Sequence, residues 1–339
     1  MTHEHERLLG ESPAFLQALE AASQIAPLNK PVLVVGERGT GKELIAARLH
    51  FLSERWDAEF VKLNCAAISD SLIESELFGH EAGAFTGAAR THKGRFERAD
   101  GGTLFLDELA TTSVLVQEKI LRVIEYGEYE RVGGSKTLKT NVRLIAATNE
   151  DLPALAAAGR FRQDLLDRLA FDVITLPPLR ERRDDILILA EQFAINMATE
   201  LGHAFFPGFS PRAQATLLEH TWPGNVRELK NAVERTVYRN PDPAAPVDDV
   251  VLDPFSSPFR PSPPAARAEA STASAASGPS IALPTDLKAE SQRFEIELLQ
   301  RAMQEARFNQ RRAAELLSLT YHQLRGYLKK YNLLKSGEE

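Results

Sequence analysis

The sequence predicts an α/β protein in which a parallel sheet flanked by helices precedes an all-helical subdomain and a C-terminal helix-turn-helix. Short β-branched runs alternate with helical patterns in the first half of the chain, which is typical of parallel sheets covered by helices. The strand-like runs stop at Pro177-Pro178, and only helical patterns follow. Near the C-terminus, a tight turn separates two short helical patterns that carry basic residues. These three observations define the fold class.

Each element has its own local signal. Ser12-Pro13 predicts a helix start, because serine is a good N-cap and proline fits the first helical position; this helix should run to about Ala26. Short apolar runs predict buried strands at Val32–Val35, Val61–Leu63, Leu104–Leu106, Val142–Ala146 and Val173–Leu176. Helical patterns predict the second, all-helical unit at Asp184–Leu201, Pro211–His220 and Asn225–Tyr238.

These elements divide the chain into four parts. We expect an α/β subdomain at residues 1–178 and a helical subdomain at 179–240. Residues 241–286 contain ten of the 19 prolines and runs of Ala and Ser, so they are expected to form a flexible linker, with an ordered patch at Val250–Phe255. Residues 287–339 should form the helix-turn-helix domain.

Composition excludes several classes of protein. No apolar run approaches the roughly 20 residues that cross a bilayer, and the first residues lack a signal peptide, so we expect a cytoplasmic protein without membrane insertion. The one cysteine, Cys65, excludes an internal disulfide and is expected to be a buried apolar residue. Seven basic residues against one acid between Arg307 and Lys335, in a chain of net charge −7, indicate an acidic body with a basic end.

A glycine-rich loop follows the first predicted strand and opens a helix. Backbone N–H groups of such a loop can surround phosphates, and Lys42 would reach the β- and γ-phosphates of a nucleotide. Glu43 stands where a Ser or Thr is usual, so magnesium would depend on Thr40, water and acids elsewhere. The alternative is a glycine-rich turn without a ligand. The candidate nucleotide-binding residues are Gly36, Glu37, Arg38, Gly39, Thr40, Gly41, Lys42 and Glu43.

Two acids end the strand that contains Leu104–Leu106. Asp107 is placed to hold magnesium through water, and Glu108 to polarise the attacking water. Two carboxylates at the end of a buried strand are costly without a cation nearby. Asp107 as a simple N-cap is the alternative. Together with the glycine loop, the pair predicts an ATPase that uses ATP and Mg²⁺.

The segment from Glu76 to Ala88 contains the sequence GAFTGA at Gly83, Ala84, Phe85, Thr86, Gly87 and Ala88. On this motif and the nucleotide motifs, the chain resembles the sigma-54-dependent activator branch of the AAA+ family over nearly its whole length. The resemblance implies an AAA+ fold and self-association into a ring. It also implies that the GAFTGA loop contacts sigma-54 and that ATP hydrolysis remodels sigma-54 RNA polymerase.

The resemblance also implies roles for single residues. Asn64 matches the asparagine that restrains the catalytic glutamate, and Thr148 and Asn149 match the first sensor. Arg162 and Arg168 match arginine fingers that reach a neighbouring subunit's nucleotide, although Leu166-Asp167 replaces the aromatic residues of many relatives. The second sensor, on the lid, is matched by Arg227.

The C-terminal pattern resembles a Fis-type helix-turn-helix with a turn near Ser318. Leu316, Leu317, Leu319, Leu324 and Leu328 should form its internal face. The apolar spacing of Phe294–Met303 predicts pairing of two tails, and a helical hairpin used only for dimerisation is the alternative. The residues expected to contact double-stranded DNA are Arg311, Arg312, Tyr321, His322, Gln323 and Arg325.

The predicted ATPase domain begins within about ten residues of Met1, which leads us to expect no receiver or sensory module. Within the family this arrangement is similar to activators of phage shock operons. It implies restraint by a separate protein, the phage shock inhibitor, a coiled-coil membrane-stress protein. Trp56 is the candidate inhibitor contact, because it lies in a polar connection, whereas Trp222 belongs to the lid motif. The alternative is that Trp56 packs on its own helix.

Two other functions are compatible with parts of the sequence. The first is an AAA+ remodelling ATPase of another class, an unfoldase or chelatase-like motor whose C-terminus binds an adaptor. The second is a DNA-binding repressor whose nucleotide site is only regulatory. The GAFTGA segment and the basic helix-turn-helix argue against the first, and turnover of ATP would argue against the second.

Overall fold

The computed structural model describes residues 8–255, 287–306, 309–331 and 333. It divides the chain into two compact units, Met1–Arg260 and Pro261–Glu339, which are described here separately. Most of the expected linker, residues 256–286, lies outside the described residues. No helix among the described residues is long and apolar enough to span a membrane.

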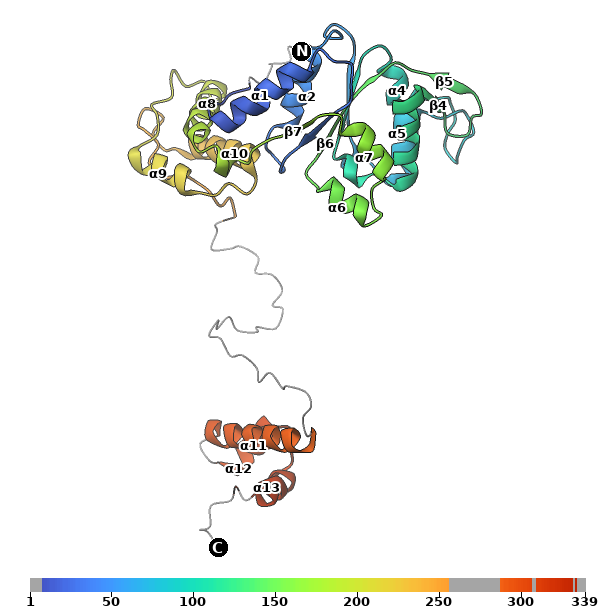
Figure 1. Ribbon diagram of the computed structural model, residues 1–339. Coiled ribbons are helices and arrows are strands. Elements are labelled where there is room, and N and C mark those ends of the chain that lie inside the picture. The colour runs from blue at the N-terminus through green and yellow to red at the C-terminus, as the bar shows by residue number, and fades with distance from the viewer. Residues whose placement is uncertain (1–7, 256–286, 307–308, 332, 334–339) are drawn as a thin grey trace. The chain divides into compact units, whose positions relative to one another are not determined.

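The centre of the first unit is a parallel sheet of five strands in the order β2-β3-β6-β1-β7 (Figure 1). Every neighbouring pair of these strands is parallel, and the five strands predicted from the apolar runs are confirmed. Their bounds are β1 Val32–Val35, β2 Phe60–Asn64, β3 Thr103–Asp107, β6 Arg143–Thr148 and β7 Val173–Thr175.

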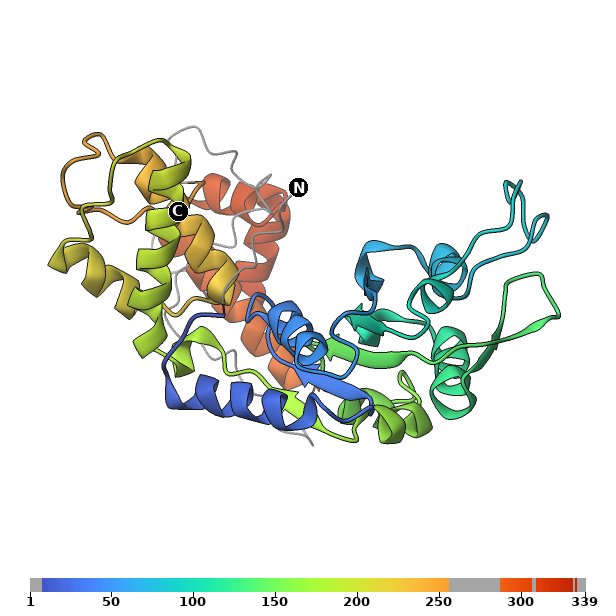
Figure 2. The same cartoon turned by 90° about the horizontal axis from the view of Figure 1, so that it is seen from above.

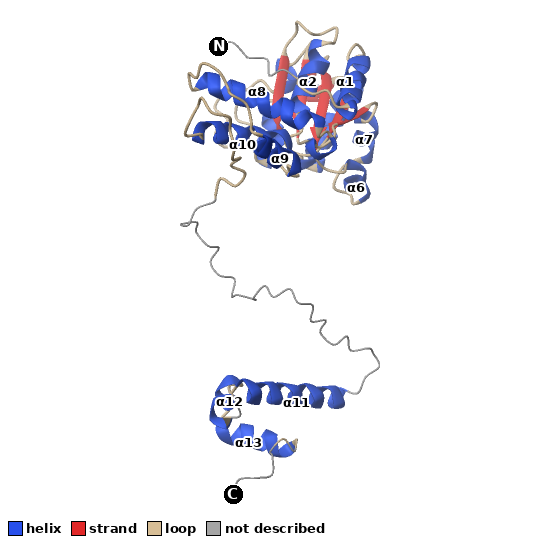
Figure 3. Ribbon diagram, turned by 90° about the vertical axis from the view of Figure 1, so that its left-hand side faces the viewer, coloured by secondary structure: helices blue, strands red, loops and turns tan. Residues whose placement is uncertain are grey.

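Alternate residues of each strand point to opposite faces of the sheet. In β1, Val32 and Val34 pack with α1 (Pro13–Ile25) and α2 (Lys42–Phe51), whereas Leu33 belongs to the core on the other face. Helices therefore cover both faces (Figure 3). The second face is covered by α3 Asp70–Phe78, α4 Arg95–Arg98, α5 Val114–Tyr126, α6 Leu152–Ala157 and α7 Gln163–Leu169.

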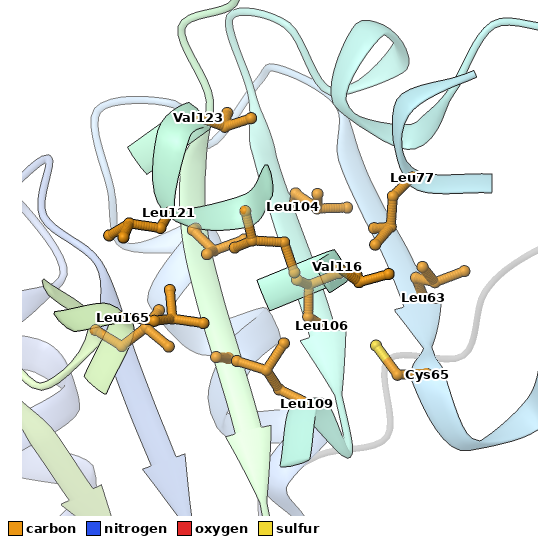
Figure 4. Close-up of a cluster of buried hydrophobic side chains, with 14 of the residues drawn as sticks. Leu63, Cys65, Leu77, Leu104, Leu106, Leu109, Val116, Leu121, Val123 and Leu165 are labelled. Carbon is orange, nitrogen blue, oxygen red and sulfur yellow. The ribbon is translucent and has the colours of Figure 1, made fainter. Parts of the chain in front are cut away.

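The larger core lies on this second face. Figure 4 shows Leu104 and Leu106 of β3 among leucines and valines from α3, α5 and α7, with Cys65 at the edge of the cluster. Cys65 begins a short 3₁₀ turn, Cys65–Ala67, and is buried, as the sequence predicts. Two further 3₁₀ turns occur at Leu109–Thr111 and Leu179–Glu181.

A short antiparallel hairpin, β4 (Glu128–Glu130) with β5 (Thr137–Lys139), follows α5. Its turn lies against the segment between α3 and α4, where the backbone N–H of Glu81 donates to the carbonyl of Val132 at 3.0 Å. In Figure 2 the two loops project together from the side of the α/β subdomain that faces away from the helices of residues 184–239, which form the lid. The sequence patterns did not predict this hairpin.

The lid contains α8 (Asp184–Glu200), α9 (Pro211–Glu219) and α10 (Asn225–Arg239), as the helical patterns predict. Trp222 is fully buried in its core, and the indole N–H donates to the carbonyl of Leu217 at 2.8 Å. Trp222 is therefore a structural residue of the lid.

The segment that was expected to begin the linker at residue 241 continues the lid instead. Val247 is buried and exchanges backbone hydrogen bonds with Gly208 and Ser210. The guanidinium of Arg235 donates to the carbonyls of Val251 and Leu252. Composition suggested a linker here because prolines and acids separate these few apolar anchors.

The described residues of the second unit form three helices, α11 (Leu287–Glu305), α12 (Gln310–Leu316) and α13 (Tyr321–Lys330). Leu324 and Leu328 are buried in its core, and Leu317 and Leu319 are half-buried. Leu316 is 51% exposed, so its expected place on the internal face was wrong. Ser318 has φ +53°, which places the turn in the left-handed region that glycine favours.

Candidate functional site

The candidate nucleotide site lies at the carboxyl ends of the parallel strands. Gly36 follows β1, while Asn64, Asp107 and Thr148 end β2, β3 and β6. The register pairs Asn64 with Asp107, and Val35 of β1 with Thr148. Because parallel strands end at one edge, residues far apart in sequence converge there, which is the usual ligand-binding edge of such sheets.

The glycine loop connects β1 to α2 with two residues in the left-handed region, Gly39 (φ +77°) and Gly41 (φ +101°). The ammonium of Lys42 folds back over this loop and donates to the carbonyls of Gly36 (2.9 Å) and Glu37 (3.3 Å). Burial lowers the pKa of Lys42, and the nearby carboxylates of Glu108 and Asp107 partly oppose that change. A phosphate would compete with the two carbonyls for this cation.

The two acids face Lys42. The Glu108 carboxylate lies 3.9 Å from the lysine nitrogen, and both side chains are nearly buried. Burial also raises the pKa of Asp107, and the positive charge of Lys42 partly opposes that change. Glu108 has φ +53°, a left-handed backbone that is rare for a residue with a side chain. Strain of this kind is concentrated at functional sites.

Asn64 and Thr148 border the acids. The Asn64 amide donates to Asp107 at 3.5 Å, and its oxygen accepts from the backbone of Ala66 at 2.9 Å. Asn64 thus contacts Asp107, the residue before Glu108. The predicted restraint of Glu108 by Asn64 stays a prediction. Thr148 is fully buried, with its carbonyl accepting from Gly36, while Asn149 is half-buried one residue further along.

Few protein groups are available for a metal. The Thr40 hydroxyl donates to the carbonyl of Glu37 at 2.8 Å, and Glu43 is an exposed partner of Lys62. Among the described residues, no group of three His, Cys, Asp or Glu side chains could hold a metal ion. The half-buried Asp107 fits a magnesium that keeps most of its ligands as water and phosphate oxygens.

The lid lies directly on the glycine loop. The backbone N–H of Val226 donates to the carbonyl of Gly39 at 3.0 Å, and a Cβ added at Gly39 would lie 2.3 Å from the carbonyl of Gly224. Arg227, in the first turn of α10, is exposed, and its Cβ lies 3.1 Å from the Cβ added at Gly39. Arg227, the predicted second sensor, therefore lies beside the glycine loop.

Sequence reasoning missed the side chains that join the lid to this loop. Asn225 donates to the Glu37 carboxylate and to the carbonyl of Arg38, both at 3.0 Å. Arg180 pairs with Glu37, and the buried Arg182 donates to the carbonyl of Thr40. The Trp-Pro-Gly-Asn segment before Arg227 was the available signal, but it does not identify the partners.

The predicted arginine fingers do not point into this chain's own nucleotide site. Arg162 is the N-cap residue of α7 and pairs with Asp164 (2.7 Å) and Glu118 (3.1 Å). Arg168 pairs with Glu125 at 2.8 Å, and its side chain is 60% exposed. A residue that acts on a neighbouring subunit must be exposed, as Arg168 is.

The GAFTGA segment forms the projecting loop between α3 and α4. Its ends meet where the N–H of Gly83 donates to the carbonyl of Ala88 at 2.8 Å. Thr86 and Gly87 are exposed, and the Phe85 ring, 40% exposed, lies edge-on to His80 with the centroids 4.9 Å apart. Ala84 packs against the turn of the β4–β5 hairpin. A Cβ added at Gly133 in that turn would lie 2.6 Å from the Cβ of Ala84.

Trp56 lies in the turn between α2 and β2, at the amino-terminal edge of the sheet and opposite the nucleotide site, and it is 62% exposed. The neighbouring Arg55 fixes this loop by donating to the carbonyls of Gly102 (3.0 Å) and Asn141 (2.6 Å). The loop is thus anchored while the indole stays in solvent.

In the second unit, all six predicted DNA contacts are exposed: Arg311, Arg312, Tyr321, His322, Gln323 and Arg325. Thr320 and Gln323 form a capping box at the start of α13, in which the Gln323 oxygen accepts from the Thr320 backbone at 2.9 Å. A contact between Gln323 and DNA would therefore use its amide nitrogen.

Comparison with known proteins agrees with these two units. Residues 8–175 match the Sigma-54 interaction domain family, residues 180–257 the AAA+ ATPase lid domain, and residues 292–331 the bacterial regulatory proteins of the Fis family. The lid match thus includes the segment after residue 240.

Relatives and a solved structure give the same assignment. The chain is 59% identical over 333 residues to the Psp operon transcriptional activator of Escherichia coli (strain K12), covering 98% of this chain and 100% of that protein. It is 51% identical over 230 residues to the transcriptional regulatory protein ZraR of Salmonella typhimurium, covering 68% and 52% of the two chains. NtrX from Brucella abortus in complex with ATP matches with a TM-score of 0.67 and 34% identity, covering 96% of this chain and 69% of that one. The chain therefore belongs to the sigma-54-dependent transcriptional activators, with an AAA+ ATPase domain, its lid and a Fis-family helix-turn-helix.

Proposed function

We propose that this activator assembles into a ring, hydrolyses ATP between subunits and converts sigma-54 RNA polymerase closed complexes into open complexes at phage shock promoters. The observation that carries the proposal is the loop Gly83–Ala88, whose tip Phe85–Gly87 is exposed, on the same domain as the Lys42–Glu108 pair. The name of the relative that matches over its full length supports the promoter class. A cytoplasmic location follows from the DNA and polymerase partners.

The chemistry divides among a few residues. Lys42 exchanges its carbonyl partners for the β- and γ-phosphates, and the Glu108 carboxylate accepts a proton from the attacking water. Bound magnesium would neutralise charge on the phosphate oxygens, held through water by Asp107. Asn64, Thr148 and Asn149 would report the state of the γ-phosphate from the ends of β2 and β6.

Charge that develops on the phosphates in the transition state needs cations. Arg227 approaches from the lid of the same chain, where it lies beside Gly39. Arg162 and Arg168 of the partner subunit would approach from across the ring. An arginine supplied in this way contributes about 10³–10⁵ in rate in comparable NTPases. Arg168 is exposed and pairs with one acid, whereas Arg162 is half-buried and pairs with two, Asp164 and Glu118. Surface pairs of this kind contribute little to stability, so both are compatible with an exchange of partners.

DNA binding belongs to the C-terminal unit. Tyr321, His322, Gln323 and Arg325 would enter the major groove, and Arg311 and Arg312 would contact phosphates. Phe294 and Leu298 of α11 are exposed apolar residues, which supports pairing of two tails on a two-fold symmetric site.

A separate protein would restrain the ATPase. The proposed partner is the coiled-coil phage shock inhibitor, and the proposed contact is Trp56, because an anchored loop presents a large exposed indole. Trp56→Ala should weaken inhibitor binding and leave basal ATP turnover near normal. Unchanged inhibition of this variant would exclude Trp56 as the contact.

The function is tested by binding of purified sigma-54 to the full chain with ATP, with ADP and with ADP plus aluminium fluoride, a transition-state analogue. Stable binding is expected with the analogue, and ATP should drive open-complex formation. A motor of another class would hydrolyse ATP without binding sigma-54, and a repressor would show no turnover.

A further inference from the structure

Glu37 connects the glycine loop to the lid through its side chain. The carboxylate accepts two hydrogen bonds from Arg180, at 2.7 and 3.0 Å, and a third from the amide of Asn225 at 3.0 Å. The hydrogen bonds from Arg180 and Asn225 hold the pKa of Glu37 below its usual value, so the residue is charged at neutral pH. A glycine loop of this type needs no acid at this position in order to bind phosphate.

The backbone of the same residue holds the phosphate-binding lysine. The carbonyl of Glu37 accepts from the Lys42 ammonium at 3.3 Å and from the Thr40 hydroxyl at 2.8 Å. One residue therefore contacts the lysine through its main chain and the lid through its side chain. A phosphate that attracts Lys42 must alter the first set of contacts.

The lid side of this junction has little freedom. Asn225 is fully buried with φ +53°, and its side chain is used on both sides, accepting from Leu179 and donating to Glu37 and to the carbonyl of Arg38. Gly39 and Gly224 approach too closely for any side chain at Gly39. Two residues after Asn225 the lid helix carries Arg227. A shift of the loop backbone must therefore reach the first turn of α10.

We propose that Glu37 is a positioning residue that transmits phosphate binding at Lys42 to the lid, with Arg180 and Asn225 as its receivers. The inference rests on the proposed nucleotide site and adds a relay to it. Arrival of the phosphates draws Lys42 from the Glu37 carbonyl, the loop backbone adjusts, and the carboxylate carries the adjustment to α10 and thereby to Arg227. The hydrogen bonds from Arg180 to Glu37 determine how strongly movement of the loop is coupled to the lid.

The relay is tested by hydrogen–deuterium exchange of the first turn of α10 in the full chain, with and without ADP. In the wild type, ADP should slow exchange of this turn. Arg180→Ala should speed exchange without nucleotide, largely remove the response to ADP and raise the KM for ATP by about fivefold, as loss of a two-point charged pair of this exposure allows. Arg180→Lys, which keeps the charge but not the two-point geometry, should recover part of the response.

The matched control is Arg212→Ala. Arg212 also pairs with acids on the lid surface, Asp248 and Asp249, but makes no contact with the glycine loop in the part of the chain that the structure describes. It should leave exchange of α10 and its response to ADP unchanged. The relay is overturned if Arg180→Ala behaves like the wild type, if Arg212→Ala behaves like Arg180→Ala, or if ADP leaves α10 unchanged in the wild type. Failure of the proposed function would appear separately, as a wild type that binds ADP with this response but does not engage sigma-54.

Discussion

The left-handed backbone of Glu108 predicts an unusual order of stability among its variants. At most positions alanine is more stable than glycine by about 0.5–1 kcal/mol, because glycine loses more backbone entropy on folding. At φ +53° a residue with a Cβ pays roughly 1–2 kcal/mol that glycine avoids. The second effect is the larger of the two, so Glu108→Gly should be more stable than Glu108→Ala by up to about 1.5 kcal/mol.

Comparing the glycine variant with the alanine variant isolates the effect of the backbone conformation, because both variants lose the same contact, the 3.9 Å approach of the carboxylate to Lys42. The backbone contacts that hold this conformation remain in both. The carbonyl of Glu108 accepts from the N–H and the hydroxyl of Thr111, at 3.0 and 2.8 Å, and its N–H donates to the Asp107 carboxylate at 3.1 Å. The strain is therefore imposed by the neighbours and not by the glutamate side chain.

Thermal unfolding of the two variants measures the difference. About 1 kcal/mol corresponds to roughly 2–4 °C in Tm for a domain of this size. Both variants should bind ATP and hydrolyse it poorly, so the more stable protein is no more active. An alanine variant as stable as the glycine variant would refute the strained backbone, and a glycine variant with wild-type turnover would refute Glu108 as the base.

Four further outcomes are expected. Lys42→Ala should abolish ATP binding, whereas Glu108→Ala should retain it; equal loss of affinity by equilibrium binding would contradict the two roles. Thr86→Ala should keep most ATP turnover and lose sigma-54 binding, because Thr86 lies outside the nucleotide edge; normal open-complex formation would contradict this. Truncation after residue 255 should keep ATPase activity and remove salt-sensitive operator binding, and operator binding by residues 1–255 would argue against two modules. Truncation after residue 240 should also lower the Tm, because it removes the buried Val247. Burial raises the pKa of Cys65 to about 12, so iodoacetamide should modify it slowly in the folded chain at pH 8 and quickly after unfolding, as mass spectrometry would show.

The strands and most helices follow from local patterns because their side chains alternate between two buried faces. Val32–Val35 is an example, since each residue has a core on its own side of the sheet. The hairpin at 128–139 has no such signal: its strands have three residues each and are largely polar. The linker boundary was misplaced because a segment such as 241–255 is fixed by a few anchors, chiefly Val247, while its average composition is that of a loop.

The same limit applies to the nucleotide site. The glycine loop and the two acids are local motifs, so the sequence is sufficient to predict Lys42 and Glu108 as site residues. The partner of Glu37 lies 143 residues away at Arg180, and the fit of the lid depends on the left-handed backbone of Asn225. Neither feature leaves a pattern in a single sequence, since both arise only when the lid packs on the loop.

The connectivity of the sheet explains how the exposed loop can respond to the nucleotide. The chain leaves β2 at Asn64, forms α3, the loop Gly83–Ala88 and α4, and returns in β3, which ends at Asp107. The loop is thus an insertion between two adjacent strands whose ends, Asn64 and Asp107, contact each other at the site. A change in the Asn64–Asp107 contact would therefore act on the start of the inserted segment. Because α3 packs in the same core as β3, it would move as a rigid element and pass such a change to the loop, where the glycines permit movement.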